Sequence, residues 1–414
     1  MILSCIKHWF LGASCVVFVT GHSVLGEETK SAGTIAGTAS PQKPYLSPKI
    51  SGSGHRIRVG TGEAALPVAV VRGTPYEMGY HLGRSFIKEI QQFVPPAVSA
   101  IAKQMELDTA TLAEVWARTA AYSDDRMEQE MLGLADGSGV DITTLQAMHA
   151  IPLLMPYSCS SIAAWGKATV DGHLYQTRNL DWSMEVGAHE FPMVAVYIPN
   201  EGVPHVVPSF AGMVGAHTGM NLRGIALSEM GDASAKEAPY QVHAAHFTSF
   251  FRTMLYDSQS LSGALKIFNA QQHTKKYHFV FGDGMNEKRA VKIRAHMEGS
   301  SSEKFKVWND NDPSDEFSPN VLSCIVYNDE GRGAFPTLQK SHGKITSASL
   351  IELANQIPIK GGNVENVVYD ATAMQLWVSY AKGKQEAYQR PYTHIDLMTL
   401  DADNDGKPDL KSMQ

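Results

Sequence analysis

The sequence predicts an α+β domain with largely antiparallel sheets. In the first part of the chain, apolar residues between 78 and 90 recur at a spacing of four, which makes one helical stripe. After Pro156, short strand-like runs separated by turn residues dominate. The pair Asp171-Gly172 lies between two such runs and is a strong hairpin signal. A helix-rich first part followed by paired strands is typical of a layered domain.

The first helix is predicted from its start signals. Thr74 can cap it, Pro75 suits its first turn, and Glu77 stands three residues after the cap. Further helices are expected at 95–105, 109–122, 124–135, 141–148, 247–272 and 347–356. Strands are expected at 66–71, 162–164, 173–177, 194–198, 205–207, 225–228, 278–281, 290–294, 366–370 and 375–380. Order is expected to begin near Arg58, so the predicted domain spans residues 58–400.

Composition limits the classes of partner. The chain has 414 residues, 43% of them hydrophobic and 19% charged, which is an ordinary globular balance. Its formal net charge of -7 argues against a nucleic-acid partner, because binding nucleic acid requires a basic face. The same charge argues against docking on anionic lipid.

Residues 1–26 have the pattern of a secretory signal peptide. Lys7 precedes an apolar stretch from Trp9 to about Val24, which is short and interrupted for a membrane span. A retained anchor is the alternative. Residues 27–57 are rich in Ser, Gly, Thr, Pro and Lys and predict a flexible linker. We therefore expect an exported protein, periplasmic or extracellular, without stable membrane insertion once the signal is removed.

The cysteines leave two thiols in the mature chain. Of four cysteines, Cys5 and Cys15 are lost with the signal, and Cys159 and Cys324 remain. A disulfide framework therefore does not hold the domain together. A bond between the two remaining cysteines stays possible and would silence both thiols.

Residues 401–414 form an acidic tail. It matches the first half of a calcium loop at Asp401, Asp403, Asp405 and Gly406, followed by Asp409. Ser412 stands at the twelfth position, where a calcium loop carries Glu. The pattern favours a solvated acidic tail and leaves calcium binding open.

The predicted hairpin gathers reactive groups at one end. With a two-residue turn at Asp171-Gly172, Ile162 pairs with Asp181. Cys159 then starts one strand, and the segment from Arg178 to Asp181 ends its partner at the same end.

One geometric difficulty accompanies this pairing. Arg178 and Asp181 are three residues apart, so a regular strand would direct them to opposite faces. Both reach Cys159 only if the strand ends or bulges near Asn179-Leu180.

These residue types suit nucleophilic catalysis. A guanidinium lowers the pKa of a neighbouring thiol, and the resulting thiolate attacks. The hairpin's one histidine, His173, lies at its far end, so the base must come from elsewhere. A freed α-amino group has an unperturbed pKa of about 7.7–8.0 and would serve, with Asp181 holding it. The alternative makes Cys159 a small buried residue and Arg178–Asp181 a structural ion pair.

Ser158-Cys159-Ser160-Ser161 and Arg178-Asn179-Leu180-Asp181-Trp182 together resemble the N-terminal-nucleophile hydrolases, in particular the acyl-coenzyme A:6-aminopenicillanic acid acyltransferase family (peptidase family C45). Choloylglycine hydrolases and acid ceramidases look like more distant relatives. Three further segments agree in order, at 72–83, 219–224 and 363–378, so the resemblance runs from about 65 to 397. It implies a four-layer αββα sandwich. It also implies an α segment, 58–158, that stays bound to a β segment, 159–400, after self-cleavage.

The resemblance also implies roles for the hairpin residues. Cys159 would be the nucleophile, exposed by cleavage after Ser158. Arg178 and Asp181 would position the thiolate and the α-amine. The reaction would be hydrolysis of, or acyl transfer from, a linear amide (C–N) bond through a thioester on Cys159. The substrate would be a small molecule, and neither a metal nor an organic cofactor would be needed.

Three positions outside the hairpin complete the expected site. Asn221 matches the residue that helps form the oxyanion hole, with a plain turn role before Gly224 as the alternative. Asn328 corresponds to a second catalytic Asn, although Asp329 departs from the family's His. The family's late arginine has no clear counterpart; Arg332 is near, but the helix that should follow it is weakly patterned.

Other interpretations of the chain stay open. It could be a cysteine hydrolase that never cleaves itself and uses a remote histidine. It could also be a secreted, non-catalytic binding protein on a degenerate hydrolase scaffold. His217 could line the pocket or serve a structural role. Cys324 lies in an apolar run and is expected in the core.

Overall fold

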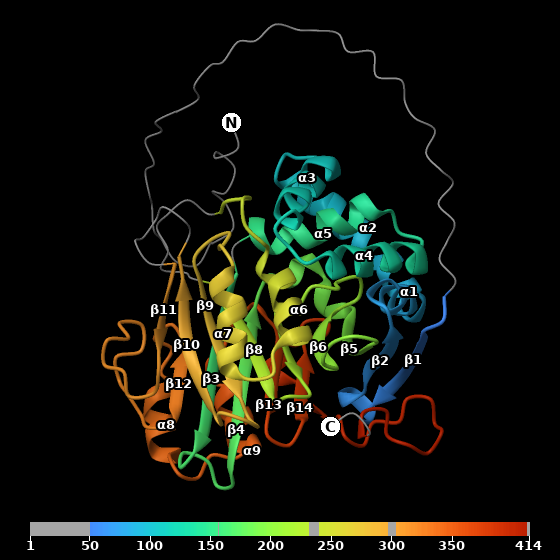
Figure 1. Cartoon of the computed structure of the whole chain (residues 1–414). Helices are drawn as coiled ribbons and strands as arrows, with labels where there is room; N and C mark the ends of the chain where they lie inside the picture. Colours follow the sequence, from blue (N-terminus) through green and yellow to red (C-terminus); the bar gives the residue numbers. More distant parts are fainter. Residues whose placement is uncertain (1–49, 156, 232–239, 297–303, 412–414) are drawn as a thin grey trace, which may run out of the picture. The chain divides into compact units, whose positions relative to one another are not determined.

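The computed structural model describes residues 50–155, 157–231, 240–296 and 304–411. The predicted signal peptide and residues 27–49 of the predicted linker lie outside them. From residue 51 onward the chain forms one compact unit, in which two sheets lie face to face with helices outside each (Figure 1). This confirms the predicted α+β class and its αββα layering. No helix within the described ranges has both the length and the apolar character needed to cross a bilayer.

The larger sheet has nine strands in the order β1-β2-β5-β6-β7-β8-β9-β10-β11. Their bounds are β1 Ser53–Val59, β2 Leu66–Gly73, β5 Pro192–Pro199, β6 His205–Phe210, β7 Thr218–Asn221, β8 Ile225–Gly231, β9 Tyr277–Asp283, β10 Arg289–Ala295 and β11 Phe305–Trp308. The strand pair β2–β5 is parallel, and the other neighbours are antiparallel.

The smaller sheet carries the predicted reactive hairpin at its centre. It has six antiparallel strands in the order β12-β3-β4-β13-β14-β15. Their bounds are β12 Ile325–Asn328, β3 Ser158–Gly166, β4 Gly172–Asp181, β13 Asn363–Asp370, β14 Gln375–Tyr380 and β15 Thr393–Asp396.

Within the described ranges, seven α-helices belong to the larger sheet's side and two to the smaller sheet's side. The first group is α1 Pro75–Ser85, α2 Ile87–Gln104, α3 Thr109–Ala120, α4 Asp125–Ser138, α5 Ile142–Leu154, α6 Phe247–Asp257 and α7 Leu261–Ala270. The second is α8 Ala334–Ser341 and α9 Ser347–Ala354, whose leucines join a separate core with Ile162 and Val368 on the outer face of the smaller sheet.

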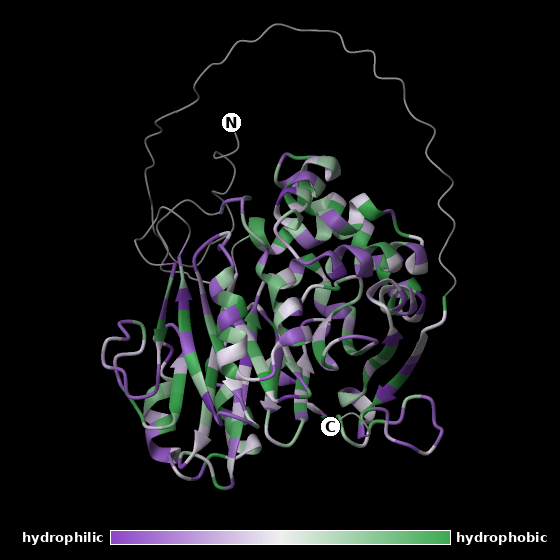
Figure 2. Ribbon diagram, in the orientation of Figure 1, coloured by the Kyte–Doolittle hydropathy of each residue, from purple (hydrophilic) through white to green (hydrophobic). Residues whose placement is uncertain are grey.

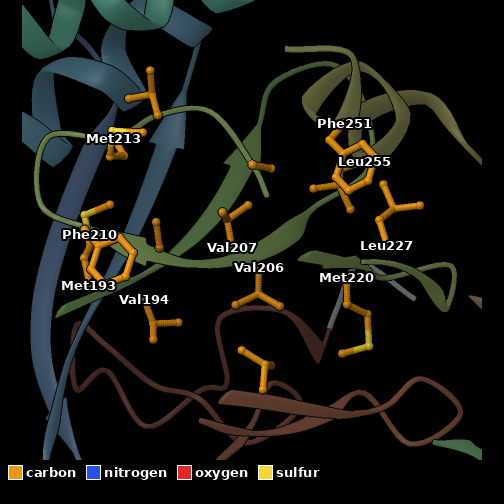
Figure 3. Close-up of a cluster of buried hydrophobic side chains, with 14 of the residues drawn as sticks. Met193, Val194, Val206, Val207, Phe210, Met213, Met220, Leu227, Phe251 and Leu255 are labelled. Carbon is orange, nitrogen blue, oxygen red and sulfur yellow. The ribbon is translucent and has the colours of Figure 1, made fainter. Parts of the chain in front are cut away.

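Apolar side chains hold these layers together. Figure 2 shows hydrophobic segments along the strands, interrupted by hydrophilic ones. Phe251 of α6 and Phe268 of α7 pack their rings against Phe281 of β9. Figure 3 shows Phe251 and Leu255 directed from α6 toward the larger sheet, where Leu255 covers Gly219 of β7. Burial of large apolar side chains of this kind is the main favourable term in folding.

The start of α1 follows the predicted capping signals. The Thr74 side chain accepts a hydrogen bond from the Glu77 amide, and the Glu77 carboxylate accepts one from the Thr74 amide, so the capping box is confirmed. The same carboxylate accepts bonds from the amides of Ser51 and Gly52. Burial alone would raise the pKa of Glu77, but these hydrogen bonds outweigh it and lower that pKa to about 2.

The predicted linker ends too late. Residues 53–57 belong to β1, which pairs with β2 along its whole length. Local composition missed this strand, because its order comes from β2 and from the Glu77 carboxylate.

Two predicted helices differ as well: α2 starts at Ile87, and the region 247–272 divides into α6 and α7 at Ser258–Ser260, where Ser260 caps α7.

The acidic tail is not wholly solvated, which corrects that prediction. The Asp409 carboxylate accepts the Ala402 amide at 2.7 Å and pairs with Arg72, and Leu410 is buried. Only a tertiary partner such as Arg72 could decide this. The carboxylates of Asp401, Asp403 and Asp405 lie within 4.8 Å of one another, and calcium binding there stays a hypothesis from the sequence.

Candidate active site

The β3–β4 hairpin has a wider turn than predicted. Cys159 lies opposite Leu180 and Ser158 opposite Asp181, so the expected pairing of Ile162 with Asp181 was wrong by four positions. Residues 167–171 form the connection. It is closed by backbone bonds such as Thr169 N–H to Gly166 O, and Gly166 and Gly172 both take positive φ. The longer loop still leaves Cys159 at the head of β3, beside the end of β4.

Arg178 contacts the thiol directly. Its Nη2 lies 3.3 Å from Cys159 Sγ, and both side chains are fully buried. The register explains this contact, because opposite residues share a face and Arg178 is two residues from Leu180, the partner of Cys159. Burial raises the pKa of the Cys159 thiol well above its usual range; Arg178 opposes that rise, and Glu229 adds to it. The thiol is therefore protonated at neutral pH.

Two buried carboxylates surround the Arg178 guanidinium. Its Nη2 lies 3.7 Å from Glu229 Oε2, and its Nη1 lies 3.7 Å from Glu365 Oε1. Tyr157 donates a hydrogen bond of 2.7 Å to Glu229. Burial raises the pKa of Glu229, while the charges of Arg178 and Lys275 work against the rise. Sequence reasoning missed Glu229 and Glu365, because no local signal distinguishes them from other polar strand residues.

Asp181 reaches the cysteine through Arg332. Arg332 Nη1 donates to Asp181 Oδ2 at 2.9 Å, and Nη2 donates to the Cys159 carbonyl at 2.9 Å. Asn363 Nδ2 donates to the other Asp181 oxygen at 3.0 Å. Burial raises the pKa of Asp181 to about 6, and Arg332 opposes this rise. The sequence required β4 to end or bulge near Asn179-Leu180. The strand ends at Asp181, and the bulge lies in β13, between Asn363 and Glu365.

The position of Arg332 could not be read from helical pattern. A turn built on Asp329 places it: Gly331 N–H and Ala334 N–H donate to the Asp329 carboxylate, and Arg332 Nε donates to the Asp329 carbonyl. Asp329 thus accepts the first amide of α8 and orients Arg332. The sequence offered one signal for a site role of Arg332, namely that it lies close to Asn328.

Asn328 offers an unused donor near the thiol. It lies opposite Ser161 in the β12–β3 pair, two residues along from Cys159 and on the same face. The residue is buried, and among the described residues its Nδ2 has no hydrogen-bond partner. A buried, unpaired N–H is unfavourable unless a ligand uses it.

Asn221 has no free donor for an oxyanion. Its Nδ2 donates to the carbonyls of Leu255 and Ser258, and its Oδ1 accepts from the amides of Arg223 and Ile225. These contacts fit the alternative, a turn role, and the expected oxyanion role gains no support from them. Local pattern could not show that this side chain would bond to the end of α6 and to its own turn.

An apolar pocket of about 50 Å³ adjoins these groups. Arg178, Glu229 and Tyr157 form part of its wall, and His217 lines it, as one of the two sequence interpretations allowed. The apolar lining consists of Phe93, Met148, Pro152, Leu180, Trp182, Ala188, Phe210, Met213 and Phe247. The cavity is smaller than the roughly 300–1,000 Å³ of most small-molecule pockets, but it shares their apolar walls and convergent polar groups.

Both remaining cysteines are free thiols. Cys324 is half-buried and packs against both apolar cores, close to the core position expected for it. The disulfide that would have silenced Cys159 is not formed.

No protein-family model matches the chain. The fold has distant counterparts among solved structures. The Caenorhabditis elegans N-acylethanolamine-hydrolyzing acid amidase ortholog is 14% identical, with a TM-score of 0.41, over 57% of this chain and all of that one. Penicillin V acylase from Agrobacterium tumefaciens is 11% identical, with a TM-score of 0.39, over 58% and 92%. A mutant conjugated bile acid hydrolase from Clostridium perfringens is 12% identical, with a TM-score of 0.38, over 59% and 94%.

Two curated relatives are similar over most of the chain. Protein dcd1B of Dictyostelium discoideum is 26% identical over 359 residues, which cover 78% of this chain and 70% of that protein. Protein dcd1A of the same organism is 25% identical over 413 residues, which cover 83% and 88%. None of these proteins is named as a member of peptidase family C45, so this chain's membership of that family stays a prediction.

Proposed function

We propose that the protein is a self-processing cysteine amidohydrolase or acyltransferase that acts on linear amides through a thioester on Cys159. One contact carries this proposal: the buried Arg178 guanidinium lies 3.3 Å from the Cys159 sulfur at the head of β3. A guanidinium in that position stabilises the negative charge that develops on sulfur during attack. Arg332 and Asp181 add a second charged pair at the backbone of the same residue.

The first reaction is cleavage of the chain before Cys159. The sulfur attacks the Ser158 carbonyl carbon, the C–S bond forms as the C–N bond breaks, and the thiol proton passes to the Cys159 nitrogen. Water then hydrolyses the resulting thioester, releasing the Ser158 carboxylate and the thiol. Arg332 keeps the Cys159 carbonyl in place throughout, since it binds that oxygen and Asp181 together.

The second reaction uses the new amine. With a pKa of about 7.7–8.0, an α-amino group takes the thiol proton as sulfur attacks the substrate carbonyl. The leaving amine receives that proton, and water or a second amine then takes the acyl group from the thioester. Asn328 Nδ2 is the available oxyanion donor, and one such donor contributes about 3–4 kcal/mol.

Intact mass of the mature protein tests this proposal. The wild type should give two fragments, one ending at Ser158 and one starting at Cys159. Cys159→Ala should give a single folded chain without activity, while the control Cys324→Ala should be cut normally. Cleavage that persists in Cys159→Ala would exclude self-processing by this thiol.

A second measurement separates the other two classes. The purified protein is tested on a panel of amides and with a thiol-reactive acyl probe. A single chain with turnover indicates an unprocessed cysteine hydrolase. Ordinary thiol reactivity without turnover indicates a non-catalytic scaffold.

We further propose that the substrate is a small-molecule amide, that the protein acts outside the cytoplasm, and that its two segments stay associated.

A further inference from the structure

The polar groups in the wall of the apolar pocket beside Arg178 are only partly paired. Among the described residues, Arg178 Nη1, Trp182 Nε1 and Glu229 Oε2 have no hydrogen-bond partner, but these atoms are fully buried. Tyr157 donates to Glu229, and Thr248 Oγ1 bonds to His246 Nδ1. His217 differs from them. The ring's hydrogen bonds within the described residues all involve Nε2, which leaves Nδ1 without a partner there. About 12% of the side chain is exposed, and the residue lines the pocket.

The ring of His217 is held in a fixed orientation. Its Nε2 lies 3.0 and 3.3 Å from the two carboxylate oxygens of Glu365, a fully buried residue of β13. The Phe210 ring stacks on it, with centroids 6.1 Å apart and an interplanar angle of 16°. Such support keeps a recognition residue in one position without help from the ligand.

This support also sets the chemistry of the free nitrogen. The two Glu365 oxygens beside Nε2 are hydrogen-bond acceptors, so we assign the ring hydrogen to Nε2, and Nδ1 then presents a lone pair. Burial lowers the pKa of His217, with Glu365 opposing, which keeps the ring neutral at neutral pH. His217 Nδ1 is therefore an acceptor that requires a donor.

We propose that His217 is a specificity-determining residue that accepts a hydrogen bond from an N–H or O–H group of the substrate. This inference rests on the proposed function in treating the pocket as the place where the substrate lies. The link to the reactive sulfur is short, because Arg178 approaches both Glu365, the partner of His217, and Cys159. The apolar walls favour a hydrocarbon body, and the oriented acceptor selects bodies that carry a donor.

Binding to the uncleaved Cys159→Ala protein tests this without any turnover. Calorimetry compares hexanamide with N,N-dimethylhexanamide, and hexan-1-ol with 1-methoxyhexane, so that each pair differs in its N–H or O–H donor. In the protein with His217, we expect the donor ligand of at least one pair to bind about tenfold more tightly. The amide pair reports an N–H donor, and the alcohol pair reports a hydroxyl.

Two variants assign the effect to the ring nitrogen. His217→Phe keeps an aromatic ring on Phe210 and should abolish the preference. His217→Gln keeps an N–H donor for Glu365 and an acceptor oxygen, so it should retain the preference for ligands with a donor. Thermal denaturation checks that each variant is folded. Equal binding within both pairs in the His217 protein would overturn the inference, as would a preference that survives in His217→Phe.

The outcome is independent of the cleavage test. A donor preference in a protein whose wild type is never cut would support the His217 site and defeat the proposed self-processing. Normal cleavage together with equal binding within both pairs would defeat the His217 site alone.

Discussion

Glu130 of α4 and Arg252 of α6 form a buried, two-bond ion pair, with Nη1–Oε1 at 2.8 Å and Nη2–Oε2 at 2.7 Å. It joins the part of the chain before Ser158 to the part after it. Arg252 also donates to the Val214 carbonyl and lies 3.8 Å above the Tyr197 ring. Because both charges are out of water, each depends on the other.

Loss of this pair should weaken the whole fold. Arg252→Met leaves Glu130 buried without its partner, and we expect the free energy of unfolding to fall by about 3–5 kcal/mol. Chemical denaturation measures the change. The control is Arg118→Met, whose pair with Glu114 is more than half exposed and contributes at most about 0.5 kcal/mol. Equal effects of the two substitutions would contradict this account.

Helices α4 and α1 are joined by a close glycine contact. A Cβ atom on Gly133 of α4 would stand 1.9 Å from the Tyr76 carbonyl of α1, so Gly133→Ala must separate the helices. We expect a loss of about 3 kcal/mol in unfolding free energy. Gly263→Ala in α7 is the matched control: its nearest neighbour is Ser260 Oγ at 3.5 Å, and alanine should stabilise that helix by about 0.5–1 kcal/mol. Thermal midpoints that move in the same direction would refute this packing argument.

Asp181 should give the protein a characteristic loss of stability with rising pH. Its pKa is about 6 in the folded chain, above the ordinary value of 3.8 that we expect in the unfolded chain. Between these values the unfolded chain has lost a proton that the folded chain keeps, so stability falls as pH rises through this window and then levels off.

Asp181→Asn should reduce that decline, and Glu229, whose pKa burial raises to about 7, should account for the remainder. The unfolding free energy, measured from pH 4 to 7, should become flatter in this variant. Asp403→Asn, at an exposed carboxylate, should keep the slope of the wild type. An unchanged slope in Asp181→Asn would show that another group titrates in the window.

The two asparagines expected at the site should behave in opposite ways. Asn328→Ala removes a donor without a partner among the described residues, so we expect little loss of stability and a fall in kcat of about 10²–10³-fold. Asn221→Ala removes bonds to four backbone groups and should lower the thermal midpoint, while the folded fraction keeps its kcat. A reversed pattern would restore Asn221 as the oxyanion donor.

Some of these features could be predicted because their causes are local. The capping box of Thr74 and Glu77 needs one turn of helix, and it is present in the structure. The meeting of Cys159 with Arg178 needs one hairpin, and it survived a turn prediction that was wrong by four positions. A hairpin brings its open ends together whatever its register, so this prediction tolerated the error.

Other features lie beyond any local signal. Arg332 reaches Asp181 across 151 residues of sequence, and Glu365 reaches His217 across 148. Neither contact has a spacing or a composition that marks it. Asn221 shows the converse: a plausible motif whose amide is used by α6, a helix that follows it in the chain.

The amino-acid sequence by itself determined the layered class, the locations of many helices and strands, and the pairing of a thiol with a guanidinium, because periodicity, caps and a hairpin act over a few residues. The tertiary structure decided which charges surround that thiol, which asparagine keeps a free donor, and which histidine faces the pocket. The physical reason is that these properties depend on burial and on partners brought from distant strands, and burial exists only once the two sheets have packed.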